Sequence, residues 1–178
     1  MRFYAHGKLM LTGEYLVLRG AGALAIPTKF GQHLEVTVHT QPEYLWRAID
    51  AYGQLWLKVD FDASWNILDS NDGDKAVLLQ RIFRQAQKIK GTPVPFCRAT
   101  TQLEFERAWG LGKSSSLIVL IAKWFQIDAF ELFKNTLTGS GYDIAAAQSD
   151  KAVLYNMLPQ MHFSQVKLPE VFQDSFFL

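Results

Sequence analysis

The stretch GKLMLTGEYLVLRG at residues 7–20 says most about the fold. It begins as an apolar strand, turns tightly at residues 12–14 and continues to Leu18 as a second predicted strand. A lysine at the start of a buried strand is costly unless its ammonium group meets a carboxylate or an anionic ligand. Glu14 in the turn is one candidate partner for Lys8. The alternative, which these residues alone favour, is an exposed Lys8 and a Glu14 that only caps the turn.

Outward from this stretch, alternating apolar and polar residues predict half-buried strands over 33–40, 54–62 and 97–105. Val38 and Leu55 are among the side chains expected to face inward, and residues 44–50 are expected to pair with 54–62. Apolar residues at helical spacing predict a helix from a cap at 71–74 to Gly91 and a second helix over 114–126. Asp128 begins a capping box for a third helix, and a short helix is expected from Tyr142. Strands followed by mixed strands and helices indicate an α+β fold.

The composition is that of an ordinary globular protein. The 178 residues are 49% hydrophobic and 20% charged, and the formal net charge is +1. Such a balance argues against nucleic acid or an anionic membrane as a partner. The single cysteine excludes an internal disulfide, and no apolar run approaches the ~20 residues of a membrane span. Without a signal-peptide core at the N-terminus, a cytoplasmic location is expected.

Two glycine-containing segments are candidate sites. In WGLGKSSS at 109–116, the glycines let the backbone approach an anion, and the helix that follows offers free N–H groups. A glycine turn before a serine-capped helix is more often structural, and a P-loop is excluded because Arg107 stands where its first glycine is required. In GSGYD at 139–143, Asp143 is either a helix cap, the commoner case, or a catalytic carboxylate near Lys8.

Together and in this order, the three segments resemble the GHMP kinase superfamily, the small-molecule kinases of galactose, homoserine, mevalonate and phosphomevalonate. Residues 7–27 match the first motif of the family, residues 110–114 match the core of its phosphate-binding motif, and residues 139–143 match the segment with the catalytic aspartate. The resemblance covers most of residues 3–155. Mevalonate kinases usually have histidine at the position of Tyr15, and in this the first motif is more similar to that of phosphomevalonate kinases. A sugar substrate is less expected.

The resemblance implies a ribosomal protein S5 domain 2-like fold over residues 1–178, as the N-terminal domain of a two-domain kinase whose C-terminal domain is missing. It implies ATP and Mg²⁺ as cofactors and phosphomevalonate or mevalonate as the acceptor. Asp143 and Lys8 would be catalytic, and Glu14, Tyr15, Ser140 and Gly141 would bind the acceptor. The nucleotide-binding residues would be Gly110, Leu111, Gly112, Lys113, Ser114 and Ser115, with Ser114 also a magnesium ligand.

Several positions depart from the family pattern. Residues 106–109 (ERAW) stand where proline and small residues are usual, and Lys113 replaces a common serine. An extra lysine there either binds phosphate or points to solvent. The magnesium-binding glutamate of mevalonate kinases falls at Leu132, and the neighbouring Glu131 is interpreted as a capping residue. These departures leave a rival hypothesis open, a non-catalytic nucleotide- or metabolite-binding protein on the same scaffold.

The C-terminal segment DSFFL at 174–178 resembles the beginning of a strand. It is expected either to complete the sheet or to start the missing second domain. An exposed truncation surface would favour association, so a homodimer is among the expected partners.

Overall fold

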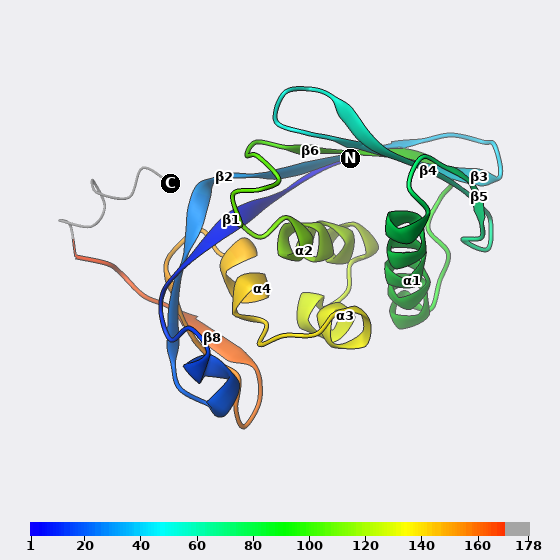
Figure 1. The fold of residues 1–178 in the computed structure, drawn as a ribbon. Coiled ribbons are helices and arrows are strands. Elements are labelled where there is room, and N and C mark those ends of the chain that lie inside the picture. Colours follow the sequence, from blue (N-terminus) through cyan, green and yellow to red (C-terminus); the bar gives the residue numbers. More distant parts are fainter. Residues whose placement is uncertain (170–178) are drawn as a thin grey trace.

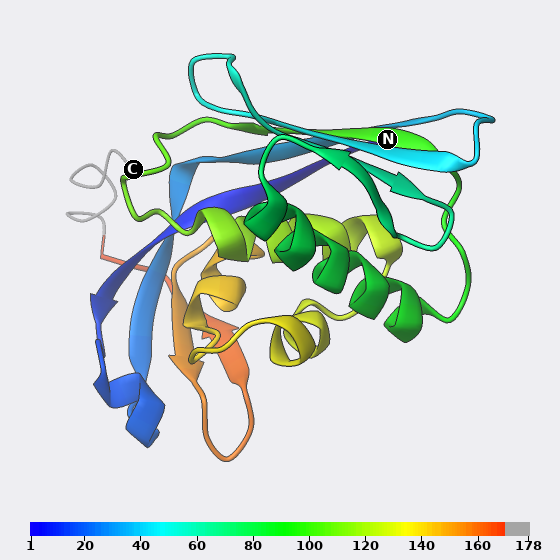
Figure 2. The same cartoon turned by 45° about the vertical axis from the view of Figure 1, so that its right-hand side comes forward.

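The computed structural model describes residues 1–169 as one sheet with its α-helices gathered on a single face (Figures 1 and 2). The strands are β1 (Arg2–Thr12), β2 (Ala23–Val38), β3 (Glu43–Ile49), β4 (Leu55–Asp62), β5 (Ile67–Ser70), β6 (Cys97–Leu103), β7 (Val153–Asn156) and β8 (His162–Gln165). The helices are a 3₁₀ helix η1 (Leu16–Arg19), α1 (Gly73–Lys90), α2 (Lys113–Phe125), α3 (Ala129–Thr136) and α4 (Tyr142–Ala147).

The long strand β2 joins the two parts of the sheet. Its edges are occupied by β1 on one side and by β6 and β7 on the other, all antiparallel to it. The strand order is β5-β4-β3-β6-β2-β7-β8, with β1 beside β2, and β3 runs parallel to β6. Figure 1 shows β1 and β2 side by side, with the end of β1 and the beginning of β2 reaching toward β8. Because β2 spans both parts, it links the two regions that carry the predicted motifs.

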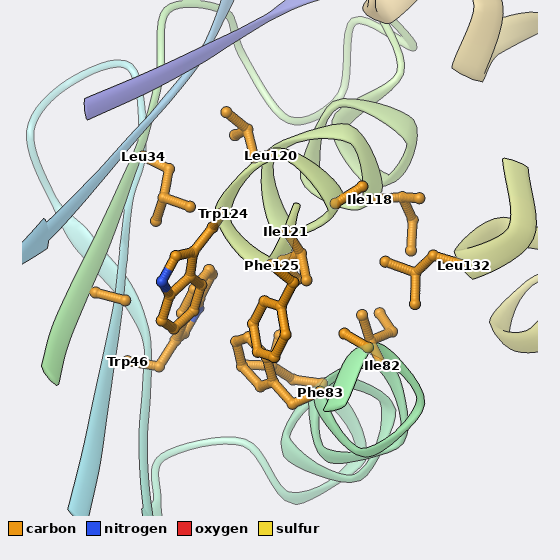
Figure 3. Close-up of a cluster of buried hydrophobic side chains, with 14 of the residues drawn as sticks. Leu34, Trp46, Ile82, Phe83, Ile118, Leu120, Ile121, Trp124, Phe125 and Leu132 are labelled. Atoms are coloured by element: carbon orange, nitrogen blue, oxygen red, sulfur yellow. The ribbon is translucent and has the colours of Figure 1, made fainter. Parts of the chain in front are cut away.

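The hydrophobic core lies between the sheet and the helices (Figure 3). Leu34 and Trp46 project from the strands toward Phe83 of α1 and Phe125 of α2, and all four side chains are buried. The expected helices are confirmed, and their caps are the expected residues: Asp72 accepts a hydrogen bond from the backbone of Lys75, and Asp128 accepts one from Glu131. Gly91 ends α1 with φ of 75°.

Two expectations about the strands are wrong. Residues 15–18 do not form a second strand, because Tyr15 has φ of 60° and the chain turns into the 3₁₀ helix η1. Of the apolar residues there only Val17 is buried, since it packs in a core cluster with Ala25 of β2 and Val153 of β7. Val38 and Leu55 are 53% exposed, because each stands at the end of a strand, beyond the helices that cover the sheet.

The short strands β5, β7 and β8 carry too little alternation to be predicted from the sequence. The segment 174–178, expected to begin a strand, lies outside the described residues. Within residues 1–169, no helix has the length and apolar character needed to cross a bilayer.

Trp65 connects the sheet to α1 through an aromatic stack. Its ring lies parallel to Tyr44 at 3.8 Å between centroids and nearly parallel to Phe83 at 4.4 Å. The backbone of Trp65 has φ of 60°, a conformation that is strained for a bulky residue. Gln80 of α1 donates a 2.7 Å hydrogen bond to the Trp65 carbonyl and helps to hold this conformation.

We expect Trp65→Ala to lower the free energy of unfolding by about 3–5 kcal/mol, because it leaves a cavity between two aromatic rings. Urea denaturation measures this loss. Trp109→Ala is the matched control: that indole is 54% exposed, so its removal should change stability by less than about 0.5 kcal/mol. Equal losses for the two variants would contradict the structural role of the stack.

Candidate active site

Lys8 lies where β1 passes closest to the loop that precedes α2. The pairing of β1 with β2 shifts register between His6 and Lys8, which leaves the Lys8 N–H free to donate a 2.9 Å hydrogen bond to the carbonyl of Leu111. Gly7 permits this approach, since a Cβ there would lie 3.1 Å from the Leu111 carbonyl oxygen and 2.4 Å from the Thr28 hydroxyl. The first motif is therefore bound directly to the glycine loop.

Gly112 is the contact point between the glycine loop and the Lys8 side chain. Its φ is 86°, and a Cβ at this position would lie 2.6 Å from the Ser115 hydroxyl and 2.8 Å from Lys8 Cγ. Gly112 is also the N-cap residue of α2, and no side chain caps this helix. The first N–H groups of α2 therefore remain available to an anionic ligand.

Asp143 lies in the first turn of α4, which follows Gly141 in the left-handed conformation. Burial raises the pKa of Asp143 above its ordinary value of 3.8, while the nearby Lys8 ammonium, the Ile144 N–H and Ser115 partly oppose this shift. The Ser115 hydroxyl also donates a 2.7 Å hydrogen bond to the Gly112 carbonyl. A hydroxyl has one proton, so Ser115 can donate to the carbonyl or to the carboxylate, but not to both.

A cavity of about 280 Å³ opens in front of Asp143. One wall comes from the turn after β1 and from η1, and includes Glu14 and Tyr15. The other wall comes from the segment before α4, and includes Ser140. The second wall is held by Tyr155 of β7, whose hydroxyl donates to the Ser140 carbonyl. Burial, together with the charge of Asp143, raises the pKa of Tyr155 to about 12, so this donor keeps its proton.

Tyr142 joins Lys8 to this cavity and was not among the predicted site residues. The Lys8 ammonium donates a 2.9 Å hydrogen bond to the Tyr142 hydroxyl, and Tyr142 lines the cavity beside Asp143. Its place within the motif GSGYD was the available signal, but the sequence does not show that its hydroxyl meets a lysine 134 positions earlier. Lys8 therefore has an uncharged partner. The Lys8–Glu14 pair, one of the two alternatives from the sequence, is absent from the ion pairs of the described residues. The other alternative, an exposed Lys8, is wrong as well, because Lys8 is half-buried.

The residues predicted to bind the nucleotide divide into two groups by the direction of their side chains. Lys113 and Ser114 line a second, mainly apolar cavity of about 190 Å³ between the β3–β4 hairpin, α1 and α2. Ser115 points instead toward Gly112 and Asp143. Leu111 is buried against Leu103 and Phe105, so its side chain anchors the loop and its carbonyl serves Lys8.

The site fits a magnesium ion that is brought by a nucleotide better than one held by protein groups alone. No cluster of three or more His, Cys, Asp and Glu side chains able to hold a metal occurs in residues 1–169. Mg²⁺ commonly binds one or two carboxylates together with substrate phosphates, which the Asp143 carboxylate and the serines at the start of α2 can complement. Leu132 is fully buried in the core, and Glu131 is exposed in the first turn of α3, where its backbone N–H donates to the capping Asp128.

Glu104 fixes the other end of the glycine loop. It accepts hydrogen bonds from the Tyr4 hydroxyl at 3.0 Å and from the Gly31 N–H at 2.8 Å, and it pairs with His33 at 2.8 Å. Burial alone would raise the pKa of Glu104, but these partners outweigh burial and lower it below the ordinary value of 4.5. The segment that leads from β6 to the glycine loop therefore begins at Glu104, whose carboxylate is hydrogen-bonded to residues of β1 and β2.

This lowered pKa predicts an acid-sensitive contribution to stability. The stabilisation is fully present above pH 4.5 and should be lost as the pH falls through the lower pKa of folded Glu104. Thermal melts of the wild type and Glu104→Gln from pH 7 to pH 3 test this. The difference in melting temperature should be largest near neutral pH and should shrink in acid; a constant difference would contradict the assignment.

Comparisons with known proteins give structural matches only. No family model matches the sequence, and no curated protein matches it. A D-glycero-D-manno-heptose 1-phosphate kinase from Bacteriodes thetaiotaomicron is similar, with a TM-score of 0.73 and 17% identity over 97% of this chain and 62% of its own. Phosphomevalonate kinase from Streptococcus pneumoniae, solved with phosphomevalonate and AMPPNP, has a TM-score of 0.68 and 20% identity over 94% and 59%. Mevalonate kinase from Methanococcus jannaschii has a TM-score of 0.71 and 14% identity over 94% and 56%.

These matches confirm the expected fold class. The described chain has an α+β fold shared with sugar and mevalonate-type kinases, the kinds of protein that the sequence resemblance implied. Identity of 14–20% establishes the fold and not the reaction. The chain spans 56–62% of the length of these three structures.

Proposed function

We propose that this protein is a GHMP-type kinase that transfers the γ-phosphoryl group of Mg-ATP to a small acceptor. The observation that carries the proposal is the meeting of three distant segments at one place. Lys8, Gly112 and Asp143 come together beside a cavity, with Ser115 between the glycine loop and the carboxylate. A lysine, backbone N–H donors, a hydroxyl and a carboxylate are the groups that phosphoryl transfer requires.

In the proposed reaction an acceptor oxygen attacks the γ-phosphorus, the bond to the β–γ bridging oxygen breaks, and ADP leaves. If the acceptor is a hydroxyl, Asp143 takes its proton; the raised pKa of Asp143 suits a base better than the ordinary value would. Lys8, held by Tyr142, offsets the negative charge that gathers between acceptor and phosphate.

We assign the nucleotide phosphates to the loop from Gly110 to Ser115 and to the free N–H groups of α2. The apolar cavity beside Lys113 and Ser114 would take the base. Ser114, at the start of α2, is proposed as a magnesium ligand, and the ion, when bound, would neutralise phosphate charge. The AMPPNP in the S. pneumoniae structure supports ATP as the donor.

Phosphomevalonate or mevalonate is the proposed acceptor, held by Glu14, Tyr15, Ser140 and Gly141. The motif at residues 12–15 and the fold shared with kinases of both compounds support this choice. Heptose phosphate and galactose are the competing acceptors, since kinases of these sugars share the fold as well.

The test is ADP formation by the protein from its whole reading frame, with Mg-ATP and each of the four acceptors in parallel. ADP release that depends on mevalonate or phosphomevalonate supports the proposal in full. Release with a sugar alone would keep the kinase and reject the acceptor. Nucleotide binding without release on any of the four would favour the non-catalytic binding protein.

A further inference from the structure

Residues 106–109, which depart from the family pattern, attach the glycine loop to the β3–β4 hairpin. The Tyr52 hydroxyl at the hairpin turn donates a hydrogen bond to the Glu106 carboxylate. The Arg107 guanidinium carbon lies 4.9 Å from the ring centroid of Trp56 in β4. The Lys113 ammonium lies 5.1 Å from the same ring, at the start of α2. One indole therefore holds two cations of the loop.

In the part of the chain that the structure describes, these two cations have no carboxylate partner. Among residues 1–169, neither Arg107 nor Lys113 takes part in an ion pair, whereas the nearby Lys75 is paired with Asp72. Lys113 is partly buried, and burial followed by the charges of Arg107 and Lys75 lowers its pKa. A cation–π contact with one ring compensates only part of the repulsion between two like charges. An anion would remove the conflict.

The adjoining cavity has further unused polar groups. Lys75, Trp56 and Lys113 line it, together with Gln32, which is only 2% exposed. The Gln32 side-chain carbonyl accepts a 2.8 Å hydrogen bond from Ser116. The Trp56 Nε1–H is buried and has no hydrogen-bond partner among the described residues. The site thus combines an apolar cavity, a buried donor without a partner, and unpaired cations at the start of an uncapped helix. This combination suits a ligand with an aromatic part and several negative charges.

We propose that Arg107 and Lys113 bind the phosphate chain of the nucleotide and that Trp56 holds both cations until the nucleotide arrives. The proposal rests on the proposed function insofar as that function places ATP at this loop. On binding, the two cations exchange the indole face for phosphate oxygens, and charge-assisted hydrogen bonds replace the weaker ring contacts. Residues that look like a defect in the phosphate-binding motif then supply the positive charge for the phosphates.

The test measures the affinity of the whole protein for ATP, AMP and inorganic tripolyphosphate by calorimetry. Arg107→Gln and Lys113→Gln should each weaken ATP binding roughly tenfold and AMP binding less than about twofold, since the lost contacts are to the outer phosphates. Lys113→Arg should recover most of the affinity. Arg98→Gln and Lys88→Gln remove exposed cations elsewhere on β6 and α1 and should leave the affinity for ATP unchanged.

Tryptophan fluorescence gives a second, independent measurement. ATP should change the emission of the wild type, because the cations leave the indole, and Trp56→Phe should abolish most of this change. An equal ATP affinity in wild type and both Gln variants would overturn the proposal, as would an equal loss of ATP and AMP binding. A wild type that binds no nucleotide would overturn it together with the proposed ATP site. The expected binding pattern without ADP formation would uphold it and reject only the proposed catalysis.

Discussion

Asp143→Asn should lower acceptor-dependent ADP formation by about 10²–10⁴-fold while leaving the protein folded. The amide keeps the shape of the carboxylate but cannot take a proton or carry a negative charge. Because burial raises the pKa of Asp143, the ionised carboxylate at neutral pH opposes folding. The variant should therefore melt at the same temperature as the wild type or higher, even as turnover collapses.

Asp128→Asn is the matched control for this prediction. Asp128 caps α3 through a 2.7 Å hydrogen bond, and asparagine caps helices as well as aspartate does. The control should keep both activity and melting temperature. Turnover by Asp143→Asn within a few-fold of the wild type would reject Asp143 as the base, and a large loss of stability would show that the carboxylate has a structural role instead.

Gly112→Ala should damage the loop more than any other single methyl group added to it. The new Cβ would lie 2.6 Å from the Ser115 hydroxyl and 2.8 Å from Lys8 Cγ, at a φ of 86° that alanine rarely adopts. We expect a loss of about 1–3 kcal/mol in the free energy of unfolding. We also expect ATP affinity and turnover to fall together, since both the helix N-terminus and Lys8 must move.

Gly91→Ala is the control that separates the effect of backbone strain from the effect of steric contact with the new Cβ. Gly91 has a similar φ of 75°, at the end of α1, but nothing lies within 4 Å of the position of its Cβ. This variant should show a modest loss of stability and normal nucleotide binding. If Gly91→Ala and Gly112→Ala had equal effects on ATP affinity, measured by calorimetry, the proposed approach of phosphates to Gly112 would be wrong.

Much of the fold follows from local signals in the sequence. Asp72 and Gly91 delimit α1, and alternation identifies β4 and β6, because capping chemistry and burial act within a few residues of each other. The predicted secondary structure was wrong where the backbone conformation of one residue overrode the preference of the residues around it. Apolar residues 16–18 read as a strand, but the positive φ of Tyr15 and the glycine at the end of η1 turn the chain into a 3₁₀ helix.

The candidate site was predicted as a set of motifs but not as an arrangement. Periodicity cannot show that Lys8 reaches Tyr142, or that Ser115 and not Ser114 lies next to Asp143. The family resemblance treats residues 106–109 as departures from a motif, whereas the structure shows Glu106 and Arg107 in contact with a hairpin about fifty positions earlier. Such contacts depend on strand pairing across the whole chain.

The shared strand β2 has a consequence for the order of folding. Ala25 pairs with Met10 on one edge and with Val153 on the other, so β1 and β2 are near neighbours in the chain while β7 is more than a hundred residues away. Pairings of high contact order form slowly, because a long loop must close before any contact compensates for its entropy. During synthesis the Glu14 wall of the cavity leaves the ribosome long before the Ser140 wall, and Tyr155 must emerge before its hydroxyl can hold that second wall. The cavity proposed for the acceptor is thus expected to be among the last parts of the protein to assemble.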